Sequence, residues 1–149
     1  MRPSVREQLV DSSKNLDILI IEDDPSIREL VSLSLLEAGH RVIKSSAIQA
    51  MDLAENTRFS LVVLDCNSPN PASAQSTIHR LRLRYPPAII VAISGYFPPH
   101  ATRDARLATA LGADCTLGKP FRCEELVAMV QRLARSITQS RGAEHRTRP

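Results

Sequence analysis

The sequence contains no tryptophan, and its aromatic content is only 3%, so aliphatic side chains must build most of the core. It also lacks any apolar run close to the roughly 20 residues that a membrane-spanning helix needs. Residues 1–16 contain no continuous apolar segment of the kind that marks a secretory signal. The 149 residues, 43% of them hydrophobic and 23% charged, match the size and composition of one globular domain. We therefore expect a cytoplasmic protein with one packed core and no membrane contact.

Cysteine is too scarce and too irregularly spaced for a disulfide framework or a zinc site. Cys66, Cys115 and Cys123 form an odd number and include no C-x-x-C pair. We expect all three to be reduced, and buried or half-buried as small apolar side chains. No metal site is therefore assigned to them.

An excess of one charge sign is also missing from the body of the chain. The formal net charge is +3, but residues 17–134 hold 12 Lys or Arg against 13 Asp or Glu, whereas residues 135–149 hold 4 against 1. A nucleic-acid interface would have to use the tail, where basic side chains could neutralise phosphates without recognising bases. The residues concerned are Arg135, Arg141, Arg146, Arg148 and His145. A solvated tail is the simpler interpretation, and nucleic-acid binding is not expected.

What the chain does contain is a regular alternation of strand and helix patterns. Five short apolar runs predict strands, at 17–22, 40–44, 60–65, 88–94 and 114–118. Three of these runs show no polar alternation, which indicates burial on both faces. Helical patterns follow the five strands, ending near residues 39, 56, 84, 111 and 137. Because parallel neighbours need crossover connections, this order predicts a three-layer α/β/α domain with a five-stranded parallel sheet.

Capping residues mark two helix starts. Asp24 followed by Pro25 is an N-cap with proline at the first helical position, and that helix stops at Gly39. Ser46, with Gln49 three residues later, forms a capping box. The last helix carries an apolar stripe formed by Leu126, Val130, Leu133 and Ile137. The domain would span 16–137, between a flexible extension at 1–15 and a disordered basic tail at 138–149.

Polar side chains follow four of the predicted strands. In open parallel sheets the ligand site forms beyond the carboxyl ends of the strands. The strand ends in question carry Glu22-Asp23-Asp24, Asp65, Ser94-Gly95 and Lys119-Pro120. We therefore expect these residues to meet at one edge of the sheet.

The residue types at this edge favour phosphoryl chemistry with a hard metal ion. Carboxylates about 4 Å apart repel by about 4 kcal/mol at an effective dielectric near 20, so Glu22, Asp23 and Asp65 need a cation to converge. Oxygen ligands without His or Cys favour Mg2+, which proteins usually bind with one or two carboxylates, waters and phosphate oxygens. An aspartate can then attack phosphorus if a metal and a fixed cation neutralise the developing charge. Asp65 is the candidate nucleophile, Lys119 the fixed cation and Ser94 the hydroxyl donor.

These motifs together resemble the receiver domain of two-component response regulators, over about residues 16–136. The resemblance rests on the acidic run in LIIEDDP, the aspartate that closes LVVLD with Pro69 four residues later, the hydroxyl residue in AISG, and LGKPF. The spacing also agrees with the family pattern: Asp23, Asp65, Ser94 and Lys119 follow one another at intervals of 42, 29 and 25 residues. The resemblance implies a stand-alone receiver domain with the flavodoxin-like strand order 2-1-3-4-5.

The resemblance further implies a role for each candidate residue. Asp65 would be the phosphoacceptor, Ser94 the switch hydroxyl and Lys119 the phosphate-binding lysine. Mg2+ would be bound by the carboxylates of Glu22, Asp23 and Asp65 and by the backbone carbonyl of Asn67.

The resemblance also implies properties of positions close in sequence to the candidate site residues. Asn67 and Tyr96 would tune hydrolysis of the aspartyl phosphate, and the Lys119-Pro120 bond would be cis. Thr116, three residues before Lys119, stands where many relatives carry an aromatic side chain that rotates inward on activation. That ring movement cannot occur in this chain.

The implied function is that of a phosphorylation switch. A sensor histidine kinase or a histidine phosphotransfer protein would donate the phosphoryl group, and a downstream protein would bind the face of the fourth helix, fifth strand and fifth helix. The chain would catalyse only its own phosphorylation and slow dephosphorylation, and would not otherwise be an enzyme.

Two alternative functions fit the same pattern less well. One is a receiver-like interaction module that is not phosphorylated. The other is a Mg2+-dependent phosphohydrolase of the haloacid-dehalogenase type, whose members carry D-x-D on the first strand. Here the candidate nucleophile Asp65 is on the third strand, and Asn67 is its second-next residue.

Overall fold

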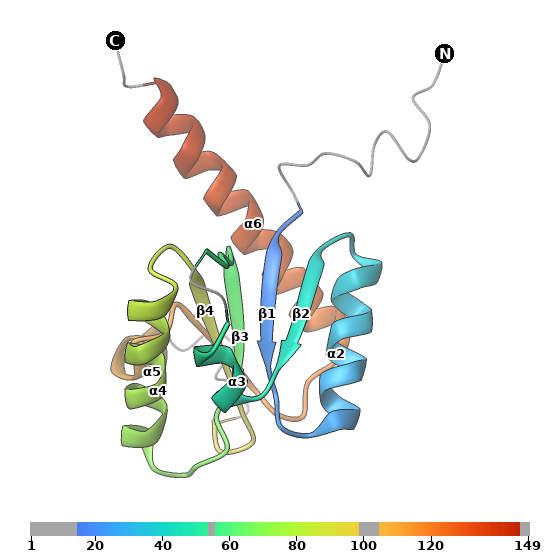
Figure 1. The fold of residues 1–149 in the computed structure, drawn as a ribbon, viewed down its shortest axis with the longest axis vertical. Coiled ribbons are helices and arrows are strands. Elements are labelled where there is room, and N and C mark those ends of the chain that lie inside the picture. Colours follow the sequence, from blue (N-terminus) through green and yellow to red (C-terminus); the bar gives the residue numbers. More distant parts are fainter. Residues whose placement is uncertain (1–14, 54–55, 99–104, 147–149) are drawn as a thin grey trace.

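The computed structural model describes residues 15–53, 56–98 and 105–146, and in these ranges five parallel strands alternate with helices (Figure 1). The strands are β1 (Asp17–Ile21), β2 (Arg41–Ser45), β3 (Leu61–Asp65), β4 (Ile89–Ser94) and β5 (Cys115–Gly118). The helices are α2 (Pro25–Glu37), α3 (Ala47–Met51), α4 (Pro71–Arg84), α5 (Ala105–Leu111) and α6 (Cys123–Arg146). The strand order is β2-β1-β3-β4-β5. This arrangement confirms the predicted α/β fold class and its strand order.

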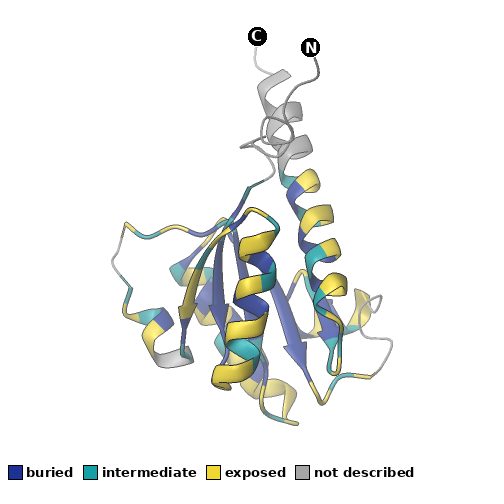
Figure 2. Cartoon of the chain, turned by 90° about the vertical axis from the view of Figure 1, so that its right-hand side faces the viewer, coloured by how far each residue is buried: buried dark blue, intermediate teal, exposed yellow. Residues whose placement is uncertain are grey.

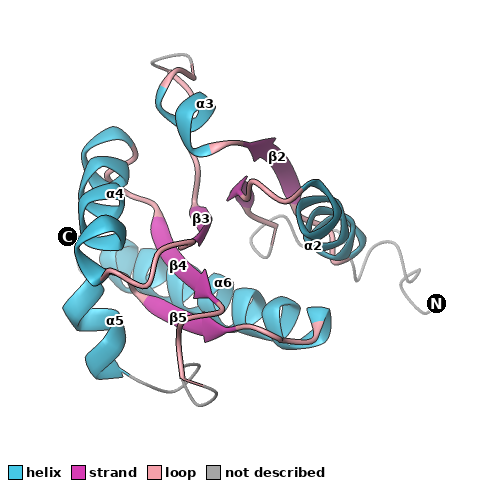
Figure 3. Cartoon of the chain, turned by 90° about the horizontal axis from the view of Figure 1, so that it is seen from below, coloured by secondary structure: helices cyan, strands magenta, loops and turns pink. Residues whose placement is uncertain are grey.

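Helices cover both faces of the sheet, which is why its central strands are apolar without alternation. α2 and α6 pack on one face, and α3, α4 and α5 pack on the other (Figure 3). Successive residues of β3 contact opposite layers: Leu61 and Val63 pack with α2 and α6, and Val62 and Leu64 with the other layer. Figure 2 shows buried strands inside helices whose outer faces are exposed. The predicted stripe of α6 is confirmed, since Leu126 and Val130 are fully buried.

Both predicted helix starts are confirmed by their hydrogen bonds. The Asp24 side chain accepts from the backbone N–H groups of Ser26 at 2.9 Å and Ile27 at 3.3 Å. The Ser46 side chain accepts from the Gln49 N–H at 3.2 Å, and the Gln49 side chain accepts from the Ser46 N–H at 3.3 Å. These caps satisfy N–H groups that have no partner inside the helix.

The second helix is shorter than predicted, because α3 ends at Met51 rather than near residue 56. Asp52 follows it, and a carboxylate is unfavourable at a helix C-terminus. The Arg84 guanidinium donates to the Leu53 carbonyl, which supplies a partner from α4 in place of a further helical turn. For the fourth helix, the predicted start at residue 101 lies outside the described residues.

The last helix is longer than predicted. The sequence analysis ended it at Ile137 and expected a disordered tail from residue 138, but α6 is helical through Arg146. Extending an existing helix needs no new nucleation, so a polar continuation without proline can remain helical. The side chain of Arg135 is exposed, whereas the other basic side chains of the tail, the final residues 147–149 and the predicted extension at 1–14 lie outside the described part. No helix in the described ranges is long and apolar enough to cross a bilayer.

We predict that two leucines of α4 contribute very differently to stability. Leu81 is fully buried and Leu83 is 69% exposed. Leu81→Ala should lower the free energy of unfolding by about 2–5 kcal/mol because it leaves a core cavity. Leu83→Ala on the same helix should change it by no more than about 0.5 kcal/mol. Urea denaturation measures both, and equal losses in the two variants would contradict this assignment of the core.

His40 lies buried at the amino-terminal end of β2, with 4% of its surface exposed. Its Nδ1 atom accepts from the Leu16 backbone N–H at 3.1 Å, so the neutral ring carries its proton on Nε2. Nε2 has no hydrogen-bond partner among the described residues. Burial lowers the pKa of His40 below its ordinary value of 6.5. In the window between the lowered pKa and 6.5, the unfolded chain binds more protons than the folded chain, so stability should fall as pH falls.

The test compares urea denaturation of the wild type and of His40→Asn between about pH 8 and about pH 5, a range that spans the ordinary histidine pKa. Asparagine keeps an acceptor near the position of Nδ1 but does not titrate. The wild type should lose more stability on acidification than the variant does. Identical pH slopes would show that His40 does not cause the loss.

Candidate functional site

The register of the sheet aligns the carboxyl ends of four strands. Ile21 pairs with Leu64, Asp65 with Ile93, and Ser94 with Gly118. Glu22, which follows β1, and Lys119, which follows β5, therefore leave the sheet at the same edge as the ends of β3 and β4. This is the edge that the sequence analysis predicted for the site.

Lys119 lies between two buried carboxylates at this edge. Its Nζ atom is 2.9 Å from Asp65 Oδ1 and 3.4 Å from Glu22 Oε2. The Asp65 and Glu22 side chains are only 4% and 7% exposed, and that of Lys119 is 22% exposed. The structure therefore brings together three of the predicted site residues from β1, β3 and β5.

Hydrogen bonds fix the positions of Lys119 and Glu22. The Lys119 N–H donates to the Ser94 carbonyl at 3.0 Å, and the Lys119-Pro120 bond is cis, as the resemblance implied. The Glu22 carboxylate also accepts from the Asp24 N–H at 3.1 Å, and the Arg28 guanidinium donates to the Glu22 carbonyl at 3.0 Å. The sequence analysis missed Arg28, because nothing in the first turns of the helix distinguishes an arginine that reaches back to the strand end.

Burial and neighbouring charges shift the pKa values of Glu22, Lys119 and Cys66. Burial, aided by the Asp65 charge, raises the pKa of Glu22 above its ordinary value, although the hydrogen bond from Asp24 opposes this. Burial acts to lower the pKa of Lys119, but the close approach of Asp65, with a further contribution from Glu22, raises it overall. The ammonium group therefore stays charged. Burial and the Asp65 charge also raise the pKa of Cys66 to about 12, so this thiol remains protonated.

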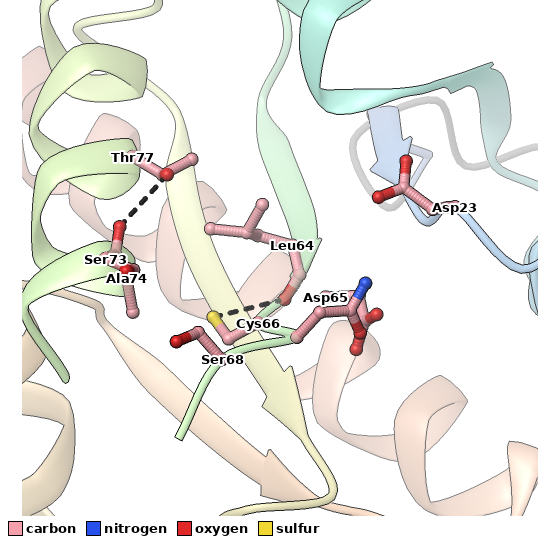
Figure 4. Close-up of a pocket in the computed structure, with 9 residues that line it drawn as sticks. Asp23, Leu64, Asp65, Cys66, Ser68, Ser73, Ala74 and Thr77 are labelled. Carbon is pink, nitrogen blue, oxygen red and sulfur yellow. Dashed lines mark hydrogen bonds between the residues drawn. The ribbon is translucent and has the colours of Figure 1, made fainter. Parts of the chain in front are cut away.

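The structure confirms what the sequence predicted for the three cysteines. Cys66 is buried, Cys115 and Cys123 are half-buried, and all three are free thiols. In Figure 4 the Cys66 thiol and the Asp65 carboxylate point to opposite sides of the strand end, as expected for neighbours in a strand. Cys66 therefore does not share the charged side of the site with Asp65.

A cavity of about 240 Å³ adjoins Asp65 and is lined by two further predicted residues (Figure 4). Asp23 and Asn67 are both exposed and line this cavity. Its other walls come from the end of β3, the segment after it and α4, and include Ser68, Ser73 and Thr77, which the sequence analysis did not single out. Hydroxyl residues are common at helix starts and in exposed turns, so no sequence signal identifies these three.

The donor set at this edge suits a hard divalent cation. Both oxygens of the buried Asp65 carboxylate lack an aligned hydrogen-bond partner among the described residues, although Oδ1 is close to Lys119. One ammonium group thus faces two buried carboxylates, with Asp23 nearby, and the available donors are all oxygens. No group of three or more His, Cys, Asp or Glu side chains in the described ranges is placed to bind a metal. Mg2+ needs only one or two protein carboxylates, since waters complete its shell.

Ser94 lies at the predicted edge, but its hydroxyl does not form a hydrogen bond with Asp65. The side chain is fully buried, and Oγ accepts from the Tyr96 backbone N–H at 3.0 Å. Because neither Asp65 oxygen has a hydrogen-bond partner in the described part of the chain, Ser94 does not bond to it. The hydroxyl is held instead by the turn that follows β4.

Comparisons with known proteins point to one domain family. A family model described as the response regulator receiver domain matches residues 18–131. The chain is 34% identical over 118 residues to the response regulator protein FleR of Pseudomonas aeruginosa, a match that covers 78% of this chain and 24% of FleR. The chain spans only about a quarter to about half of the length of the first curated relatives that it matches.

Solved structures show the same fold. The chemotaxis response regulator CheY4 of Vibrio cholerae superposes with a TM-score of 0.63 at 28% identity, covering 78% of this chain and 96% of CheY4. The receiver domain of the sensor histidine kinase PA1611 from P. aeruginosa gives a TM-score of 0.62 at 26% identity, covering 80% of this chain and 98% of that domain. That structure is described with a magnesium ion coordinated in the active site cleft.

We predict that Lys119 stabilises the fold in a pH-dependent way. Lys119→Met would leave the buried carboxylates of Asp65 and Glu22 without their cation, and in the absence of divalent ions this should lower the free energy of unfolding by about 1–3 kcal/mol near neutral pH. The loss should shrink as pH falls, because a raised folded-state pKa means that Glu22 takes up a proton and ceases to repel Asp65.

A matched variant controls for the loss of a lysine. Lys44→Met removes the ion pair with Glu29, whose two side chains are 44% and 56% exposed, and should cost only about 0–1 kcal/mol. Urea denaturation in EDTA at several pH values measures both variants. A pH-independent loss for Lys119→Met, equal to that for Lys44→Met, would contradict the prediction.

Proposed function

Since this chain belongs to the response regulator receiver domain family, whose model matches residues 18–131, we propose that it takes up a phosphoryl group on Asp65 and thereby switches the binding of a partner protein. The observation that carries the proposal is the Asp65 carboxylate, which is buried, lacks an aligned hydrogen-bond partner among the described residues and lies 2.9 Å from the Lys119 ammonium group. A buried carboxylate beside a fixed cation is a suitable nucleophile for an electrophilic phosphorus atom.

Asp65 is the nucleophile of the proposed reaction. An Asp65 carboxylate oxygen forms a bond to phosphorus while the bond from phosphorus to the donor's imidazole nitrogen breaks, and the electron pair leaves with the imidazole. The neighbouring Cys66 does not compete, because its thiol remains protonated. Lys119 stabilises the negative charge on the phosphoryl oxygens.

The other site residues bind and orient. Mg2+ would be held by Glu22, Asp23, Asp65 and the Asn67 carbonyl, and when bound it neutralises charge between the carboxylates and the incoming phosphoryl group. The Ser94 hydroxyl donates a hydrogen bond to a phosphoryl oxygen once it turns away from Tyr96. Burial of the Glu22 and Asp65 side chains makes these electrostatic interactions stronger than they would be in water.

The family supports a proposal for the phosphoryl donor and for the downstream contact. Response regulators interact with sensor histidine kinases, and we assign the donor to such a kinase or to a histidine phosphotransfer protein in the cytoplasm. We assign the downstream contact to the face formed by α5, β5 and α6. The proposed functional unit spans about residues 16–137, and the chain would act on no substrate other than its own phosphoryl group.

We predict one phosphoryl adduct per chain when the purified protein is incubated with acetyl phosphate and Mg2+. Intact mass spectrometry measures the adduct. EDTA should suppress it, and Asp65→Asn should abolish it because the amide is not a nucleophile at that position. Asp17→Asn should retain it, since this variant removes an exposed carboxylate at the opposite end of the sheet, where Asp17 pairs with Arg41.

Two results would overturn the proposal. One is an adduct that persists in Asp65→Asn. The other is the absence of any adduct together with no change in thermal stability when Mg2+ is added. The second result would favour a receiver-like interaction module that is not phosphorylated.

A further inference from the structure

The Ser94 hydroxyl forms a hydrogen bond within its own turn and none with Asp65. Ser94 Oγ accepts from the Tyr96 N–H at 3.0 Å, and the Phe97 N–H approaches the Ser94 carbonyl at 3.4 Å. The Ser94 side chain is fully buried, so water does not replace the Tyr96 contact easily. If the hydroxyl turns toward Asp65, it must release this N–H group.

The turn itself lies against β5 and exposes one aromatic ring. A Cβ atom on Gly118 would lie 2.8 Å from the Pro98 carbonyl oxygen, so the turn contacts β5 where that strand has no side chain. Phe97 is partly buried against the core cluster on the α4 and α5 side of the sheet. Tyr96, in contrast, is 60% exposed. Tyr96 is therefore the large side chain of this turn that is least restrained by packing.

β5 offers no ring that could follow the movement of Ser94. Thr116, which pairs with Ala92 of β4, is 2% exposed and carries no aromatic group. Its small side chain fills a place in the core, and no large group can rotate into a space near Ser94 from this position. The turn that Ser94 starts therefore offers a route by which a change at its side chain can reach the surface.

We propose that the backbone N–H of Tyr96 holds Ser94 in the resting state, and that phosphorylation moves the Tyr96 ring rather than a residue of β5. This inference rests on the proposed phosphorylation of Asp65. When Ser94 turns, its Oγ atom moves away from the Tyr96 N–H, from which it accepts, and its hydroxyl donates a charge-assisted hydrogen bond to a phosphoryl oxygen. The freed Tyr96 N–H no longer ties its residue to the Ser94 side chain, so the ring moves and changes the surface that a partner binds.

Fluorine NMR of the protein labelled with 3-fluorotyrosine tests this inference, because the chain has only two tyrosines. Tyr85 is 2% exposed and donates its hydroxyl to the Ala50 carbonyl, so its resonance serves as the internal reference. Tyr96→Phe assigns the two resonances. On addition of Mg2+ and beryllium fluoride, a mimic of the phosphoryl group, the Tyr96 resonance should shift and the Tyr85 resonance should not.

Variants of the unphosphorylated protein test the hydrogen bond by itself. Ser94→Ala removes the acceptor and should shift the Tyr96 resonance without any phosphoryl mimic, whereas Ser94→Thr keeps a hydroxyl and should leave it near the wild-type position. Thr116→Val, a substitution of similar shape on β5, should leave the response to beryllium fluoride intact. If Thr116→Val abolishes that response, or if Ser94→Ala leaves the Tyr96 resonance in place, the inference is wrong.

Intact mass after treatment with acetyl phosphate separates the two levels of failure. An Asp65-dependent adduct combined with an unmoved Tyr96 resonance would overturn this inference and leave the proposed function standing. The absence of both the adduct and the response to beryllium fluoride would overturn the two together.

Discussion

The ammonium group of Lys119 is the charge on which the arrangement of this site depends. It lies 2.9 Å from Asp65 and 3.4 Å from Glu22, two carboxylates that burial would otherwise force into strong repulsion. The three side chains come from three different strand ends, so they meet only if the sheet has the order and register observed. Lys119 is itself positioned by a backbone hydrogen bond to Ser94. The sheet and the site therefore support each other: the strand order brings the charges together, and the cation makes their burial tolerable.

This arrangement leaves the site short of positive charge, which accounts for its proposed chemistry. One ammonium group opposes two buried carboxylates, and the exposed Asp23 adds further negative charge. A divalent cation would offset this excess of negative charge. Together with Lys119 it would also neutralise the charge of a phosphoryl group on Asp65. Cys66 contributes none of this chemistry, because burial keeps its thiol protonated. The candidate nucleophile at this edge is therefore a carboxylate, and the Ser94 hydroxyl accepts from the Tyr96 N–H within its own turn.

The sequence predicted the layers of the fold and the order of its elements because its strands are short apolar runs separated by helix-capping and turn residues. Each strand lies within one residue of its predicted ends, and the caps at Asp24 and Ser46 are present. The helix ends were harder to predict. α3 stops early where Arg84, distant in the sequence, binds the Leu53 carbonyl, and α6 continues to Arg146 without an apolar period. A hydrophobic pattern detects the part of a helix that packs, but it detects neither tertiary contacts that end a helix nor polar turns that merely continue one.

For the site, the sequence by itself determined which side chains leave the strands at one edge, since parallel strands end together and Glu22, Asp65, Ser94 and Lys119 each follow an apolar run. Only the tertiary structure decided how these side chains interact. It placed Lys119 between the two buried carboxylates, directed the Ser94 hydroxyl to the Tyr96 N–H rather than to Asp65, and added Arg28 behind Glu22. The physical reason is that spacing along the chain defines which residues reach an edge, whereas rotamers and hydrogen-bond partners depend on atoms that only folding brings within about 3 Å.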